Sequence, residues 1–188
     1  MFWALIAVGF GAGVLALLEP AGADTNRWAI RATAILPVCF WCVGWPIALT
    51  RRLYVVGNHF QWTGGCVGCL LHIAVAFHLG HGWSHETAWE HTRQVGGYGE
   101  GVYVNYAFAL VWLFDVVWLW VAVQSYKARP WWLKWPIHGF LAFVVFNAAV
   151  VFGGWEARSY FAIFFTTTLL VVLYDATTHP AIADDSGK

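Results

Sequence analysis

The sequence predicts an all-α protein, a polytopic bundle of about six transmembrane helices, and three observations lead to that prediction. Of the 188 residues, 60% are hydrophobic and 11% are charged, whereas a soluble domain carries about 25% charged residues. The apolar residues fall into six runs, each near the ~20 residues that a helix needs to cross the hydrocarbon core of a bilayer. These runs are too long and too uniformly apolar for barrel strands, and lipid otherwise admits only helices.

The six apolar runs extend over the whole chain with only polar connections between them. They cover approximately residues 2–18, 28–50, 62–85, 102–126, 131–152 and 159–178. The longest connection, residues 86–101, is predicted as a polar loop. We therefore expect one integral membrane domain over residues 1–188, ending in a short polar tail over residues 180–188. If the first run is not a span, five helices remain; no basic residue precedes Arg27, which argues against a cleaved signal peptide.

The Lys and Arg residues in short connections predict the orientation of such a bundle. With six spans, the side that holds both termini carries Arg51, Arg52, Lys127, Arg129, Lys134 and Lys188. The opposite side carries Arg27, Arg31, Arg93 and Arg158. This excess places both termini in the cytoplasm, and we expect a bacterial inner (plasma) membrane protein.

The tryptophans divide into two groups by their position in the apolar runs. Those near the ends of runs are expected in the membrane–water interface, where the amphipathic indole is favoured; they are Trp28, Trp62, Trp83, Trp131, Trp132 and Trp155. Trp112 and Trp118 lie inside a run, so we expect them to pack against neighbouring helices.

A cluster of histidines at the outer end of the third run is the first candidate site. If that helix continues through residue 85, then His78, His81 and His85 lie on one stripe, because each residue turns by about 100°. Three neutral imidazoles on one stripe can chelate zinc, copper or iron. Glu86 and Glu90 follow at the water interface and can support such a site. The alternative is that each imidazole separately hydrogen-bonds headgroups or loop carbonyls.

Two further histidines, His72 and His138, suggest a second type of site. Counting residues from the outer ends of their antiparallel runs places both near the middle of the bilayer, where an imidazole is costly without a partner. Two histidines that face each other from different helices can ligate a b-type haem. The alternative is a hydrogen bond from His72 to Asp115 or to a backbone carbonyl.

Asp115 lies in the middle of the fourth run, within "ALVWLFDVVWLW". A carboxylate at that depth must face the bundle interior or water. We expect His72 to be its partner, in a proton relay, in support of a metal ligand or in a structural contact. Asn105 and Asn147 lie at a depth that can support His78 and His81, although ordinary helix–helix hydrogen bonds explain them equally well.

The four cysteines form two C-x-x-C pairs, Cys39/Cys42 and Cys66/Cys69. Such a doublet indicates zinc in a soluble protein, whereas in lipid a cysteine is a tolerated small apolar residue. Both interpretations remain open here. A disulfide within one pair is not expected, because residues three apart on a helix have poor geometry for the bond.

Three functions follow as hypotheses. The first is an intramembrane metal site near the outer face, in a metalloenzyme acting on a lipid-soluble substrate or in a metal-handling protein. The second is a haem b electron-transfer subunit using His72 and His138, and the third is an accessory subunit of a larger membrane complex. The expected partners are membrane lipid and further membrane subunits or copies of the chain, and zero net charge gives no reason to expect nucleic acid.

Overall fold

A computed structural model of the chain describes residues 24–49 and 56–148, together with residues 158, 161, 162, 166 and 170. Within these residues the protein is helical and contains no strand, which confirms the all-α prediction. The predicted first span, residues 2–18, and most of the sixth, residues 159–178, lie outside the described residues, as does the polar tail. The number of spans therefore stays a prediction.

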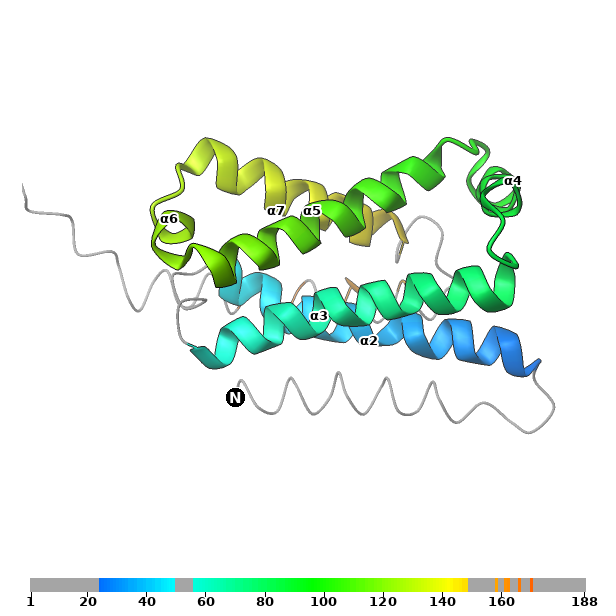
Figure 1. Ribbon diagram of the computed structural model, residues 1–188, viewed down its shortest axis with the longest axis horizontal. Helices are drawn as coiled ribbons and strands as arrows, with labels where there is room; N and C mark the ends of the chain where they lie inside the picture. The colour runs from blue at the N-terminus through cyan, green and yellow to red at the C-terminus, as the bar shows by residue number, and fades with distance from the viewer. Residues whose placement is uncertain are drawn as a thin grey trace, which may run out of the picture.

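Four long helices follow one another along the chain, and each runs antiparallel to the long helix before it (Figure 1). Helix α2 (Thr25–Leu49) and helix α3 (Val56–Val75) form one pair, and helix α5 (Gly101–Val121) and helix α7 (Trp131–Phe146) lie over it. Helix α3 packs against both α2 and α5, and α5 packs against α7. The short helix α6 (Val123–Lys127) joins α5 to α7 at one end of the bundle, and α4 (His85–Gly96) lies across the other end.

The third predicted run does not continue as one helix to residue 85, because the helix changes geometry and stops. A π-helical turn, η2 (Ala76–Gly80), follows α3 directly. The chain then turns through Gly82 and Trp83, which both adopt positive φ angles of 56° and 62°. His85 therefore begins a new helix, and the stripe of three histidines on one continuous helix is wrong.

The predicted polar loop over residues 86–101 is also wrong in its first part, which forms the amphipathic helix α4. The side chain of Ser84 accepts a hydrogen bond from the backbone N–H of Thr87 at 3.2 Å, and this caps the helix start. Gly97 ends the helix in the left-handed region, with φ 83°, as is typical of helix C-termini. Both are local signals that the apolar pattern does not include.

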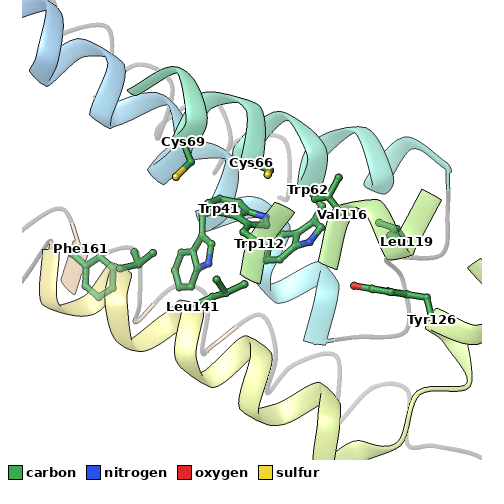
Figure 2. Close-up of a cluster of buried hydrophobic side chains, with 11 residues drawn as sticks. Trp41, Trp62, Cys66, Cys69, Trp112, Val116, Leu119, Tyr126, Leu141 and Phe161 are labelled. Carbon is green, nitrogen blue, oxygen red and sulfur yellow. The ribbon is translucent and has the colours of Figure 1, made fainter. Parts of the chain in front are cut away.

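The centre of the bundle is a cluster of buried aromatic and aliphatic side chains. Figure 2 shows Trp41, Trp62 and Trp112 gathered between α3 and α7, with Tyr126 reaching toward them from the side of α6. Trp112 is buried, as predicted, but Trp62 is fully buried as well, so its predicted interfacial position is wrong. Trp28, Trp83, Trp131 and Trp132 are exposed, as interfacial residues would be.

Two of the described helices are long and apolar enough to cross a membrane, judged by length and composition. They cover His59–Gly80, with 22 residues, and Gly101–Val121, with 21 residues. Their apolar side chains point mostly outward, since only 17% and 28% of the two most apolar windows are buried. A core helix of a soluble protein would show the opposite, with most of its apolar residues covered.

Candidate functional site

A charged cluster inside the bundle is built on Asp115, whose side chain is completely buried. Its Oδ1 accepts a hydrogen bond from Nη1 of Arg129 at 2.6 Å. Its Oδ2 accepts two more, from Nε1 of Trp62 at 2.9 Å and from the hydroxyl of Tyr126 at 2.9 Å. The other end of the guanidinium, Nη2, lies 2.8 Å from Nε2 of His138. We call these five residues the Asp115 cluster.

Four helices and the turn after one of them hold the Asp115 cluster together. Asp115 lies on α5, Trp62 on α3 and His138 on α7, while Tyr126 belongs to α6 and Arg129 to the turn that follows it. Helix α5 ends at Val121, and the backbone of the next residue, Ala122, leaves the helical region. The break lets α6 turn back, so that the guanidinium of Arg129 lies 3.8 Å above the ring of Tyr126 in a cation–π contact.

The prediction that Asp115 faces the bundle interior is confirmed, but His72 is not its partner. His72 lies ten residues beyond Trp62 on α3, about 15 Å farther along the axis at 1.5 Å per residue. Its Nδ1 lies 3.3 Å from the hydroxyl of Thr33 on α2. The structure therefore gives Asp115 a cation as partner in place of an imidazole.

The two residues of the predicted haem site face different neighbours. His138 packs against Trp62, with ring centroids 5.6 Å apart, whereas His72 faces α2. Moreover, Nε2 of His138, the atom that a haem iron would need, already contacts Arg129. The structure does not bring His72 and His138 together, and the residues present do not fit a haem held between them.

The predicted metal ligands at the outer end have three different environments. His78 accepts a hydrogen bond at Nδ1 from the indole of Trp83, at 3.2 Å. His85 contacts the hydroxyls of Tyr106 at 3.0 Å and Tyr103 at 3.4 Å. His81 packs against the ring of His91 instead, with centroids 5.4 Å apart.

His81 and His91 line an open pocket of about 560 Å³ on one face of α4, together with Glu86 and Glu90. Burial lowers the pKa of His81, and the neighbouring His91 lowers it further, so the ring is neutral near neutral pH. Bonds from Arg93 and Gln94 lower the pKa of Glu90 to about 2. Among the described residues, no three His, Cys, Asp or Glu side chains are grouped closely enough to hold a metal ion.

The other candidate residues from the sequence form no hydrogen bond with the Asp115 cluster and do not line the pocket, as far as the structure describes them. Asn105 is exposed, and Asn147 donates to the carbonyl oxygen of Phe143 at 2.8 Å. Cys66 and Cys69 are free thiols buried in the apolar core. The side chains of Cys39 and Cys42 lie outside the described residues.

Sequence reasoning missed three members of the Asp115 cluster: Arg129, Tyr126 and Trp62. The sequence predicts Arg129 in a connection at the membrane surface, yet its side chain is 2% exposed. The signal that could have found it is the demand of a buried carboxylate for a cation, which Arg129 meets from only fourteen residues away. Because Arg129 is buried, it no longer counts among the Lys and Arg residues of the connections from which the orientation is predicted.

Comparison with protein-family models found no match, and comparisons with curated proteins and with solved structures found none either. The function of this chain is therefore argued from its own residues.

Proposed function

We propose that the chain is an integral membrane bundle of about six helices that binds a small lipid-soluble molecule in its interior, at the Asp115 cluster. The membrane part of the proposal is supported by the outward-facing apolar side chains of the two candidate spans. A soluble monomer rarely leaves large apolar patches exposed. Ionisable residues inside such a bundle are costly and usually mark a functional centre.

One observation carries the ligand-binding part: the polar groups of the cluster and its surroundings are only partly satisfied. Nε of Arg129 and Nδ1 of His138 are buried without a hydrogen-bond partner among the described residues. The same holds for the indole Nε1 of Trp41 and of Trp112 in the adjoining core. Each such group costs about 1–3 kcal/mol if it stays unpaired.

That cost argues against a purely structural role for the cluster. Four unpaired donors at about 1–3 kcal/mol each approach the whole stability of a typical domain, about 5–15 kcal/mol. An apolar replacement of the ion pair would pack the helices without this cost. A bound molecule that accepts hydrogen bonds from these groups would offset it.

A metal site at the outer end is a second candidate, in a revised form. The observation that favours it is the contact between His81 and His91 beside Glu86 and Glu90, together with an Nδ1 of His81 that has no partner among the described residues. Two imidazoles and one carboxylate are a common ligand set for zinc, but among the described residues no third ligand lies close enough to His81 and His91, so a carboxylate of Glu86 or Glu90 must move toward them when zinc binds. Elemental analysis after zinc loading should give one zinc per chain in the wild type and none in His81→Ala/His91→Ala.

The ligand proposal is tested by extracting the purified protein with organic solvent and identifying what it releases by mass spectrometry. The wild type should release one lipid-soluble compound reproducibly, at about one molecule per chain. Asp115→Leu/Arg129→Met removes the charged pair with little change in volume and should release much less. Equal release from both proteins would contradict the proposal, and a stable partner subunit in the wild-type preparation would favour the accessory role.

A further inference from the structure

The unpaired polar atoms around the Asp115 cluster are all of one chemical kind, hydrogen-bond donors. An indole Nε1 can only donate, and so can Nε of an arginine. This covers the orphaned atoms of Trp41, Trp112 and Arg129. Only the orphaned Nδ1 of His138 can take either role, depending on its tautomer.

The contact with Arg129 fixes that tautomer. A guanidinium never accepts a hydrogen bond and stays protonated in proteins, so its Nη2 must donate to Nε2 of His138, 2.8 Å away. An imidazole nitrogen that accepts carries no proton, and the proton of the neutral ring then sits on Nδ1. His138 therefore presents a fourth N–H donor that has no partner among the described residues.

The charges of the cluster are already balanced. Asp115 and Arg129 form an ion pair at 2.6 Å, and His138 is neutral because its Nε2 accepts. A negatively charged ligand would therefore bring an uncompensated charge into a buried apolar site, which is costly. The unpaired donors are therefore best matched by a ligand that has acceptor atoms and no net charge.

Water alone complements this site poorly. A water oxygen accepts from the orphaned donors, but each water also brings two donors that need acceptors. Asp115 already accepts three hydrogen bonds out of about four that a carboxylate can take. Every buried side-chain atom without a partner in the described parts of the chain is a nitrogen. A carbonyl oxygen, which only accepts, matches these donors better.

The surroundings also favour a flat molecule. The indoles of Trp62 and Trp112 lie with ring centroids 5.2 Å apart, and the ring of His138 lies 5.6 Å from that of Trp62 (Figure 2 shows the two tryptophans). Aromatic faces pack best against other planar π-systems. A planar ring that carries carbonyl oxygens matches these surroundings chemically, but the rings of Trp62 and Trp112 are 0–1% exposed and contact each other, so its binding requires these side chains to separate.

We infer that the ligand of the buried centre is an uncharged, planar, lipid-soluble carbonyl compound of the quinone type, held by N–H donors of Trp112, Trp41 and His138. This inference rests on the proposed ligand-binding function and narrows it to one chemical class. Arg129 acts as a positioning residue as well, because its bond to Nε2 sets the tautomer in which His138 donates.

The test compares two probes of the same shape on the full chain in detergent. Duroquinone is a flat tetramethylated ring with two carbonyl oxygens, and durene is the same ring without them. Duroquinone should raise the thermal unfolding temperature in a saturable manner, and durene should not.

Trp112→Phe keeps the ring and removes one donor, so it should weaken duroquinone binding about threefold to tenfold, the value of one hydrogen bond. Trp120→Phe is the matched control, because its indole already donates to Thr63 at 2.8 Å, and it should leave the affinity unchanged.

The other outcomes separate this inference from the proposed function. Equal shifts with duroquinone and durene would overturn the carbonyl assignment while leaving a lipophile-binding interior intact. Equal weakening by Trp112→Phe and Trp120→Phe would also overturn it, because the orphaned donor would then have no special role. Duroquinone without effect on a wild type that still releases a bound lipophile would place the ligand in another class.

Discussion

Asp115 determines how the interior of this bundle is arranged at the scale of single residues. Its carboxylate joins α5 to α3 through Trp62, and to α6 and the turn after it through Tyr126 and Arg129. Each of these bonds involves an ionised group, and such bonds are roughly twice as strong as neutral ones. The interior position of Asp115 could be predicted from the cost of a lone carboxylate in lipid. Its partners could not, because they depend on where the break at Ala122 directs the chain.

The ion pair predicts an asymmetric response to single and double substitution. Asp115→Leu leaves the guanidinium of Arg129 buried without a counter-charge and should lower the free energy of unfolding by about 3–5 kcal/mol. Asp115→Leu/Arg129→Met removes both charges and should recover most of that loss. Unfolding in mixed SDS micelles measures both. A double variant that is as unstable as the single one would show that the charges themselves hold the fold.

The hydrogen bond from Trp62 to Asp115 can be measured against a matched tryptophan. Trp62→Phe and Trp112→Phe shrink the same ring at two sites that are both almost fully buried, but only Trp62 donates to the carboxylate. Trp62→Phe should therefore cost about 1.5–3 kcal/mol more, the value of a bond to a charged acceptor. Equal losses of unfolding free energy in the same micelle assay would contradict the assigned bond.

At the scale of elements, helix α3 approaches its neighbours closely through a row of glycines. A Cβ atom on Gly65 would lie 2.6 Å from the indole of Trp112, and one on Gly68 would lie 3.3 Å from the backbone of Pro37. Small residues of this kind let helices in lipid pack at short distance. This packing is what places Trp62 of α3 against Asp115 of α5.

An added methyl group should destabilise the protein at Gly65 of α3 and stabilise it at Gly139 of α7. Gly65→Ala forces Trp112 to move and should cost about 1–3 kcal/mol, as overpacking does. Gly139→Ala on α7 meets no atom within 4 Å and should gain up to about 1 kcal/mol from its higher helix propensity. Thermal unfolding in detergent should thus rank Gly139→Ala above the wild type and Gly65→Ala below it. The reverse order would contradict the α3–α5 contact.

The limits of sequence reasoning are clearest in the elements around the histidines. Apolar periodicity predicts where helices lie, and α2, α5 and α7 begin within three residues of the predicted positions. It does not predict where a helix ends inside an apolar run. The turn after Gly80 depends on positive φ angles at Gly82 and Trp83, and it separates His81 from His85. The metal prediction assumed a continuous helix and for that reason selected the wrong set of neighbours.

At the scale of the whole molecule, the exposed apolar side chains of α3 and α5, the two helices long and apolar enough to cross a membrane, agree with the proposed membrane setting. Leu110, Phe114 and Val121 are 61–80% exposed, although the charged cluster lies buried behind them. Exposed apolar side chains around a buried ionised cluster are what is expected of a protein in a membrane. Helix α6, which carries Tyr126 of the Asp115 cluster, and helix α4, which lines the pocket, lie at opposite ends of the bundle (Figure 1).

This arrangement predicts that the two ends of α5 lie on opposite sides of the membrane. Tyr98→Cys, before α5, should react with a membrane-impermeant maleimide on intact cells. Gln124→Cys, after α5, should react only once the cells are permeabilised. Both original side chains are exposed, so access within the protein is not limiting. Labelling of both from the same side would contradict a span over Gly101–Val121.

The central claim is that the interior of the bundle offers N–H donors to a bound carbonyl compound, and the indole N–H signals test it most directly. In a nitrogen-15 correlation spectrum of the full chain in micelles, each signal can be assigned by its loss in a Trp→Phe variant. Duroquinone should shift the Trp41 and Trp112 signals downfield and leave that of Trp120, which already donates to Thr63, in place. Unmoved Trp41 and Trp112 signals at saturating probe would contradict the account.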